Sequence, residues 1–253
     1  MDEAPEPLAA VALPIPTGRD REWASRVVWM ERSGPYAEAF RHLAVRVRTE
    51  LGSRGASSLM ITSALPQEGK TLTACNLALA LASLTTTERV ALVDLDLRVP
   101  SVSATFGVQT RVGVGEVLAG DASLQTVVVA TDAGLDLYPV AARYLAAHQL
   151  LGRSELPDLM KQLETRYRWV ICDTGPALLV PDVQIIAPHV GACLAVVRSG
   201  RTPRSALRAL GDRLPQGKMI GFFLNDARPP AHARRYYRSS YYSADPAPPE
   251  EAS

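Results

Sequence analysis

Ala-Leu-Pro-Gln-Glu-Gly-Lys-Thr occupies residues 64–71, between a short apolar run and a long segment rich in alanine and leucine. Gly69, Lys70 and Thr71 at such a strand-to-helix junction are typical of a phosphate-binding loop. In that loop backbone amides bind phosphates, the lysine contacts the β and γ oxygens, and the threonine hydroxyl meets Mg²⁺. The full pattern places glycine at the first position, where this chain has Ala64. The loop therefore predicts a nucleotide site with one departure from the usual pattern.

Two further apolar runs end in aspartate, one at Asp94, with Asp96 two residues later, and the other at Asp173. An open α/β sheet binds its ligand at the carboxyl ends of its strands. The loop and the carboxylates together predict a site for ATP and Mg²⁺. Thr71, Asp94 and Asp173 are the expected metal-binding residues, directly or through water, because Mg²⁺ keeps several waters and takes few carboxylates.

Apolar runs and helical segments alternate along the chain, which predicts a doubly wound, mostly parallel α/β sheet of the P-loop type. The runs are almost wholly apolar, as strands covered on both faces require. Strands are expected near 58–63, 90–95, 135–140, 168–173, 192–198 and 219–225, and helices near 70–84, 113–119, 155–166 and 203–214.

Another helix is expected to begin near Pro35, because proline suits the first helical turn. Its apolar stripe recurs with helical spacing at Phe40, Leu43, Ala44, Val47 and Leu51. The opposite face carries Glu38, Arg41 and Arg48, for which plain solvation is one interpretation.

Length and composition exclude several classes of protein. The 253 residues, 47% of them hydrophobic, predict one domain rather than two. A net charge of +1 gives no sign of a nucleic-acid partner. No apolar run is long enough to span a membrane, and a secretory signal is not expected because residues 1–7 lack its basic and apolar regions. The 3 cysteines lie in apolar segments, so buried, reduced thiols and a cytosolic compartment are expected. We expect a disordered arm at 1–30, a domain at 31–226 and a flexible tyrosine-rich tail at 227–253.

Several blocks, in order and spacing, resemble those of the bacterial tyrosine autokinases that control capsule and exopolysaccharide export. They are Thr62–Thr71, Val93–Pro100 with its aspartate-x-aspartate-x-arginine pattern, Ile171–Pro176, Val196–Thr202, Ile220–Asn225, and the tyrosines Tyr236, Tyr237, Tyr241 and Tyr242. The resemblance runs from about residue 33 to 242. It implies a P-loop domain of the deviant Walker, partitioning-ATPase-like kind.

The same resemblance implies an ATP-dependent kinase that phosphorylates its own tail tyrosines in trans and regulates polysaccharide chain length or export. It assigns catalysis to Lys70, Asp94, Asp96 and Asp173, nucleotide binding to Pro66, Gln67, Glu68, Gly69, Lys70, Thr71, Leu72 and Asn225, and oligomerisation to Glu38 and Arg41. The implied partners are further copies, in a ring, and a membrane-embedded polysaccharide co-polymerase that holds the cytoplasmic kinase at the inner face of the bacterial membrane.

Transfer to tyrosine requires a base, because the phenol has a pKa of about 10 and is a poor nucleophile at neutral pH. Asp96 and Asp94 are both candidates, and an ion pair with Arg98 is the alternative role for Asp96. The tail is long enough: Tyr236 lies eleven residue steps after Asn225, and an extended chain of eleven steps spans roughly 36 Å. A tyrosine-rich tail can also be a mere interaction segment.

The chain departs from the family at several positions. Gln67 stands where members usually have glycine, and glutamine is strained there if the backbone φ is positive. Ala44 takes the third place of the glutamate-x-x-arginine-x-x-arginine pattern of the oligomerisation helix, where Arg48 is a possible substitute. An ATP-binding regulatory subunit with little kinase activity is therefore one alternative function. A partitioning-type ATPase is another, disfavoured because Leu65 occupies the place of its signature lysine.

Overall fold

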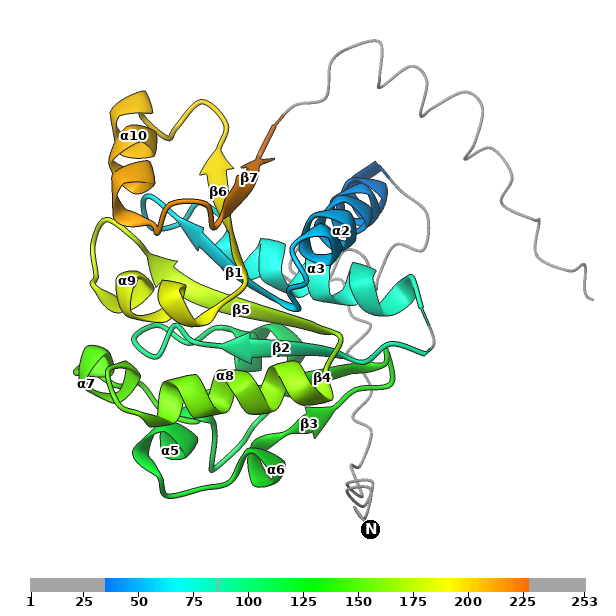
Figure 1. Cartoon of the computed structure of the whole chain (residues 1–253), viewed down its shortest axis with the longest axis vertical. Coiled ribbons are helices and arrows are strands. Elements are labelled where there is room, and N and C mark those ends of the chain that lie inside the picture. Colours follow the sequence, from blue (N-terminus) through cyan, green and yellow to red (C-terminus); the bar gives the residue numbers. More distant parts are fainter. Residues whose placement is uncertain (1–34, 86, 228–253) are drawn as a thin grey trace, which may run out of the picture.

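A seven-stranded sheet forms the centre of the computed structural model, which describes residues 35–85 and 87–227 (Figure 1). The strand order is β3-β4-β2-β5-β1-β6-β7. All neighbouring strands are parallel except β3 and β4, which are antiparallel. The strands are β1 (Ser58–Ser63), β2 (Val90–Asp94), β3 (Val129–Ala130), β4 (Leu135–Tyr138), β5 (Trp169–Pro176), β6 (Ala192–Arg198) and β7 (Met219–Asn225).

Helices cover both faces of the sheet, and each face has its own hydrophobic core. One core is formed with α2 (Pro35–Ser53), α3 (Lys70–Ser83) and α4 (Val102–Phe106). The other is formed with α5 (Val114–Ala119), α6 (Leu124–Val127), α7 (Ala147–Leu151), α8 (Glu155–Arg166), α9 (Asp182–Ile186), the 3-10 turn η2 (Ala187–His189) and α10 (Arg204–Arg213). The doubly wound, mostly parallel fold predicted from the sequence is confirmed.

Strand β1 shows why the apolar runs are continuous. Leu59 and Ile61 point into the core beneath α2 and α3, whereas Met60 points into the opposite core. Because successive side chains of a strand face opposite ways, a strand buried on both faces needs apolar residues at every position. All six residues of β1 are buried.

The predicted strands and long helices are present within a few residues of their expected bounds. The strand expected at 135–140 ends at Tyr138, and β5 continues past Asp173 to Pro176. The sequence did not predict β3, α4, α6, α7 or α9, each of which has at most five residues. Such elements are too short to show a helical or strand period.

Helix α2 packs on α3 through the predicted apolar stripe. Phe40, Ala44, Val47 and Leu51 are buried, and Leu43 is partly buried against the same core. Phe40 also lies against Phe223 of β7, with ring centroids 5.3 Å apart. The helix is therefore fixed to the domain along its length.

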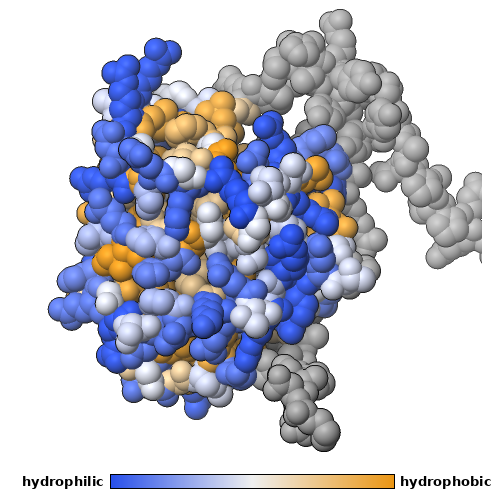
Figure 2. All heavy atoms as spheres, viewed as in Figure 1, coloured by the Kyte–Doolittle hydropathy of each residue, from blue (hydrophilic) through white to orange (hydrophobic). Residues whose placement is uncertain are grey.

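The expected arm at 1–30, the tail at 227–253 beyond Ala227, and the four tail tyrosines lie outside the described residues. Within them, Cys75, Cys172 and Cys193 are buried, as expected, and are not joined in disulfides. Most of the surface in view is hydrophilic, and apolar side chains gather at the top over β6 and β7 (Figure 2). Phe222 and Leu224 of β7 are each more than half exposed.

Candidate active site

The predicted phosphate loop joins the carboxyl end of β1 to α3, and α3 begins at Lys70. Lys70 and Thr71 therefore lie in the first turn of a 14-residue helix, whose free amides and dipole favour an anion. The helix is capped by Gly69, in the left-handed region with φ of 97°. This is the strand–loop–helix geometry that the sequence predicted.

Gly69 is required by the close approach of Asn225. A Cβ built on Gly69 would lie 2.0 Å from the Asn225 side-chain nitrogen. That nitrogen donates a hydrogen bond to the carbonyl oxygen of Glu68 at 2.9 Å. The end of β7 is thus fastened to the back of the loop.

Gln67 has a φ of 59°, so this loop position does require the left-handed region. Asp226 is the other non-glycine residue with a positive φ in the described ranges. An L-residue with a Cβ is disfavoured there by roughly 1–2 kcal/mol. Arg198 donates from Nη1 to the Gln67 carbonyl oxygen at 3.3 Å, which holds the strained turn.

Glu68 holds the loop through its side chain. The carboxylate is almost fully buried, and it accepts hydrogen bonds from the Leu65 amide at 2.8 Å and from the Thr202 hydroxyl. Thr202 in turn accepts the Arg198 amide at 2.9 Å. Glu68 therefore contributes to the site by shaping the loop from behind.

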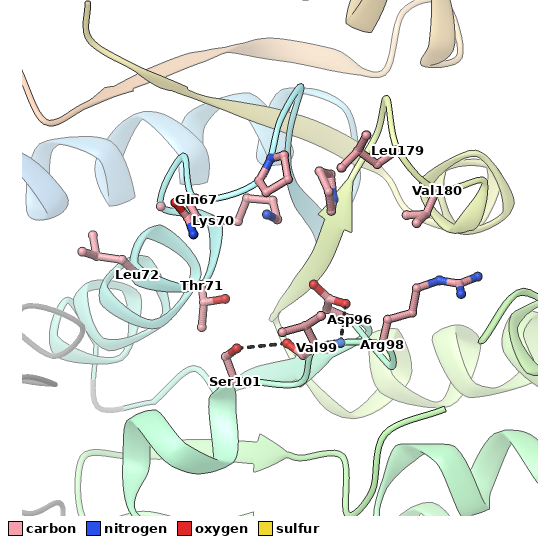
Figure 3. Close-up of a pocket in the computed structure, with 13 residues that line it drawn as sticks. Gln67, Lys70, Thr71, Leu72, Asp96, Arg98, Val99, Ser101, Leu179 and Val180 are labelled. Atoms are coloured by element: carbon pink, nitrogen blue, oxygen red, sulfur yellow. Dashed lines mark hydrogen bonds between the residues drawn. The ribbon is translucent and has the colours of Figure 1, made fainter. Parts of the chain in front are cut away.

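A cavity of about 500 Å³ opens beside the loop (Figure 3). Gln67, Lys70, Thr71 and Leu72 lie on one side of it, Leu179 and Val180 on another, and Asp96, Val99 and Ser101 along the bottom of the view. The remaining lining residues are Pro66, Gly69, Arg98 and Pro176. Of the predicted nucleotide-binding residues, Glu68 and Asn225 are not in the lining and lie behind the loop.

The carboxyl ends of β2 and β5 bring Asp94 and Asp173 next to each other in register. Both side chains are fully buried. Burial raises the pKa of Asp173 to about 7, and the Thr71 hydrogen bond and the charge of Lys70 act in the opposite direction. Burial and the neighbouring Asp173 raise the pKa of Asp94 as well.

The two carboxylates differ in their partners. Asp173 Oδ2 accepts a hydrogen bond from the Thr71 hydroxyl at 2.6 Å. The other carboxylate oxygen, Oδ1, is buried and has no hydrogen-bond partner among the described residues. Asp94 accepts three backbone amides, from Asp96, Ser101 and Val102, at 3.0–3.1 Å. Asp94 therefore fixes the loop that follows β2.

This arrangement fits Mg²⁺. The Thr71 hydroxyl oxygen and the Asp173 oxygen without a partner are oxygen ligands of the kind that Mg²⁺ prefers, and they lie together beside the start of α3. This ion is usually held by one or two carboxylates, waters and phosphates. A buried carboxylate oxygen without a partner calls for an explanation, and an ion or its water supplies one. No group of three His, Cys, Asp or Glu side chains in residues 35–85 and 87–227 forms a metal cluster.

Asp96 is the carboxylate that faces the cavity. It accepts the Val99 amide at 3.0 Å through Oδ1. A Cβ built on Gly175 would lie 3.8 Å from both Asp96 carboxylate oxygens and 3.3 Å from Val180. Asp96 therefore lies between its own loop and the carboxyl end of β5, with its carboxylate on the cavity side.

Arg98 does not pair with Asp96, so that alternative role for Asp96 is not what the structure shows. Its Nε donates to Asp182 Oδ2 at 2.7 Å and its Nη2 to Asp182 Oδ1 at 3.0 Å. Nη1 donates to the Leu145 carbonyl oxygen at 2.6 Å. Such a forked pair fixes geometry strongly, and with the Leu145 bond it joins the loop after β2 to the start of α9 and to the turn before α7.

On helix α2, Glu38 and Arg41 form an ion pair with each other. Ala44 is fully buried, so it faces the core and not the charged side. Arg48 pairs with Glu88 at 3.2 Å and lies 5.8 Å from the Trp169 ring centroid. Solvation is therefore the wrong interpretation for Arg48, which packs on the domain.

Sequence reasoning missed the side chains that hold the site from behind. Thr202 acts through Glu68, which is 134 positions away in the sequence. Asp182 acts through Arg98, which is 84 positions away. Thr202 belongs to the Val196–Thr202 block, which was a usable signal, whereas nothing in the sequence marked Asp182.

The fold and site define a P-loop domain: a phosphate loop between β1 and α3, with buried aspartates at the ends of the adjoining strands. The same fold occurs in the septum site-determining protein MinD from Pyrococcus horikoshii, at 23% identity with a TM-score of 0.55 over 72% of this chain and 76% of that one. No protein-family model matches the chain.

The curated relatives indicate a narrower class of protein than the fold does. Tyrosine-protein kinase YwqD of Bacillus subtilis is 30% identical over 204 residues, which cover 79% of this chain and 85% of that protein. Tyrosine-protein kinase ptk of Acinetobacter johnsonii is 31% identical over 75% of this chain. The kinase domain of the Escherichia coli tyrosine kinase ETK superposes with a TM-score of 0.74 at 28% identity, over 84% of this chain and 81% of that one.

The chain belongs to the bacterial tyrosine-protein kinase family. It spans 85% of YwqD but only 26% of the length of ptk. Within the described ranges, none of the helices has the length and apolar character needed to cross a membrane.

Proposed function

We propose that this chain is an ATP-dependent protein-tyrosine autokinase that regulates exopolysaccharide or capsule chain length or export. One observation carries the proposal: Asp96 and the loop residues Lys70 and Thr71 line the same cavity, on different sides of it. A nucleotide held by the loop would present its terminal phosphate toward Asp96. Phosphoryl transfer depends mainly on positioning and charge stabilisation, which is what this arrangement supplies.

Each residue then has a role that follows from its position. Lys70 and the amides at the start of α3 bind the phosphate oxygens. Thr71 and Asp173 hold Mg²⁺, which neutralises charge on those oxygens when it is bound. Asp94 is fully buried and occupied by backbone amides, so Asp96 is the better candidate for the base that accepts the tyrosine proton.

The acceptors in this proposal are Tyr236, Tyr237, Tyr241 and Tyr242. They follow Asn225, which is attached to the phosphate loop, by a stretch long enough to reach a neighbouring subunit. Residues 227–243 contain four arginines and no acidic residue, so the segment is positively charged. We expect transfer in trans, from one subunit to the tail of another.

The proposal extends to assembly and location. Glu38 and Arg41, partly exposed on one side of α2, would contact a neighbouring copy in a ring. A membrane-embedded polysaccharide co-polymerase would hold the kinase at the inner face of the cell membrane and activate it. One relative, from Rhizobium meliloti, is named succinoglycan biosynthesis transport protein ExoP and is 30% identical over 79% of this chain. Its name is consistent with a role in polysaccharide transport.

A second candidate function is an ATP-binding regulatory subunit of the export complex, with little kinase activity. The observation that favours it is the positive φ of Gln67, which places a strained side chain in the phosphate loop. The three aspartates of the site favour the kinase.

The test is incubation of the purified full chain with Mg-ATP, alone and with the cytoplasmic segment of the membrane partner, followed by phosphosite mapping. A Lys70→Met variant serves as the control. Phosphate on the four tail tyrosines that disappears in the control supports the kinase. ATP binding without transfer in either condition supports the regulatory subunit.

A further inference from the structure

We propose that Val99 and Leu179 form an acceptor rim, two apolar side chains that grip the aromatic ring of the incoming tyrosine beside Asp96. This inference rests on the proposed kinase function and names the surface that selects its substrate. The occupant is a tyrosine side chain from residues 236–242 of a second copy of this chain.

The rim residues are exposed where apolar side chains are usually covered. Val99 is 56% and Leu179 61% exposed, and both line the cavity that contains Asp96. Leu145 is 89% exposed, and its carbonyl oxygen accepts a hydrogen bond from Arg98, the residue before Val99. Exposed apolar side chains clustered at a polar cavity mark a binding site more often than scattered ones do.

The position of the rim relative to the phosphate loop points to the acceptor. In Figure 3, Leu179 and Val99 lie above and below Asp96, across the cavity from Gln67 and Leu72 beside the loop. A phosphate group bound by the loop would leave the side of the cavity next to Val99 and Leu179 free for the acceptor. A ring inserted between Val99 and Leu179 would bring its hydroxyl to the Asp96 carboxylate.

The rim is also built to keep its shape. Arg98 ties the Val99 loop to Asp182 and to Leu145. The Tyr144 amide donates to the Leu97 carbonyl oxygen at 2.9 Å, and the Val99 amide donates to Asp96. A rim that is rigid before the acceptor arrives loses little entropy on binding it.

Chemistry favours tyrosine as the occupant. An aromatic ring buries a large apolar area while its hydroxyl needs a polar partner, and the rim offers apolar walls around one carboxylate. In the reaction the tyrosine Oη proton passes to Asp96 while Oη forms a bond to the γ phosphorus of ATP. The bond from that phosphorus to the β,γ-bridging oxygen breaks and ADP leaves.

The experiment uses the full chain with its four tail tyrosines changed to phenylalanine, and a synthetic peptide of residues 227–243 as acceptor at saturating Mg-ATP. We expect Val99→Ser and Leu179→Ser each to raise the KM for the peptide about tenfold, the order expected for losing a hydrophobic contact with a substrate. We expect kcat and the Kd for ATP to stay within about twofold to threefold.

Matched controls come from exposed apolar residues outside the cavity. Val45 on α2 is 52% exposed and Leu224 on β7 is 54% exposed, so Val45→Ser and Leu224→Ser should leave the peptide KM unchanged. An unchanged KM in the rim variants would overturn the inference. A parallel loss of ATP affinity would also overturn it, because the rim would then bind the nucleotide base.

Failure of the kinase proposal is separable from failure of the rim. If the parent chain transfers no phosphate, binding of the fluorescent peptide in the presence of a non-hydrolysable ATP analogue still tests the rim. Tyrosine-to-alanine peptides should bind more weakly to the parent chain, and this difference should vanish in Val99→Ser and Leu179→Ser. Equal binding of both peptides to the parent chain would contradict the rim.

Discussion

Asn225 donates a 2.9 Å hydrogen bond from its side-chain amide to the main-chain oxygen of Glu68, which joins the last strand to the phosphate loop. The same side chain fills the space where a Cβ on Gly69 would be. The loop conformation therefore depends on a residue 157 positions away.

We expect Asn225→Ala to lower the affinity for ATP by about twofold to tenfold, because one hydrogen bond of this kind is worth about 0.5–1.5 kcal/mol. Isothermal titration with a non-hydrolysable ATP analogue measures the change. Gln216→Ala, at an exposed amide in the turn before β7 and so at the other end of that strand, should have no effect. Unchanged affinity in Asn225→Ala would show that the loop holds its shape without this bond.

A double-mutant cycle tests the contact between Gly69 and Asn225 directly. Gly69→Ala should destabilise the chain more in the presence of Asn225 than in the Asn225→Ala background, where the clash is removed. Residues in contact usually show coupling above about 0.5 kcal/mol in urea denaturation. Additive effects would contradict the close approach.

Gln67→Gly should stabilise the protein, because it relieves a positive φ of 59°. The gain is expected to be up to about 1 kcal/mol, since the relief of roughly 1–2 kcal/mol is partly offset by the greater freedom of glycine in the unfolded chain. Gln67→Ala keeps the strain and removes the side chain, so it separates the two effects. If Ala and Gly stabilise equally, strain is not the cause.

The raised pKa of Asp173 predicts a pH-dependent stability. An unfolded aspartate titrates near pH 4, whereas the folded carboxyl titrates near pH 7 because it is buried. Between these values the folded chain holds a proton that the unfolded chain has lost. The free energy of unfolding of the nucleotide-free protein should therefore fall as the pH rises from about 4 to about 7.

Urea denaturation at pH 5 and at pH 8 measures this slope. Asp173→Asn should flatten it, whereas Asp158→Asn, on the exposed side of α8, should leave it as in the wild type. An equal slope in the wild type and in Asp173→Asn would show that another group dominates.

Glu38→Ala and Arg41→Ala should each reduce the oligomer fraction in mass photometry while changing the unfolding free energy little. A partly exposed ion pair between residues three apart on a helix contributes only about 0.2–0.5 kcal/mol. Glu50→Ala is the matched control, because Glu50 lies on the same helix and pairs with Arg54 just past the helix end. Loss of oligomers in all three variants would assign the effect to the helix as a whole.

The sequence was sufficient for the parts of this site that are local. The Gly69-Lys70-Thr71 turn follows from neighbouring residues, and the strand-ending aspartates follow from the apolar runs before them. The usual glycine at position 67 indicated where a positive φ would strain this chain, and the structure shows that Gln67 has one. The candidate base, left open between Asp94 and Asp96, required the structure, because only the backbone partners of Asp94 show that it is occupied.

Contacts between distant segments were beyond sequence reasoning. The pairing of Arg98 with Asp182 depends on how α9 lies beside the loop after β2, and the nearer Asp96 was the natural guess. Glu68 looked like a nucleotide contact because it is in the loop, yet Thr202 and the Leu65 amide hold it inside the protein. These pairings are decided by packing rather than by local spacing.

The most direct test of the central claim is the initial rate of tyrosine phosphorylation by Asp96→Asn, compared with the wild type at saturating Mg-ATP. If Asp96 is the base of a tyrosine kinase, the variant should bind ATP within about threefold of the wild type and transfer phosphate at least about 100-fold more slowly. Transfer at the wild-type rate would contradict the role of Asp96. Absence of tyrosine phosphorylation in the wild type itself, with the membrane partner's segment present, would contradict the kinase.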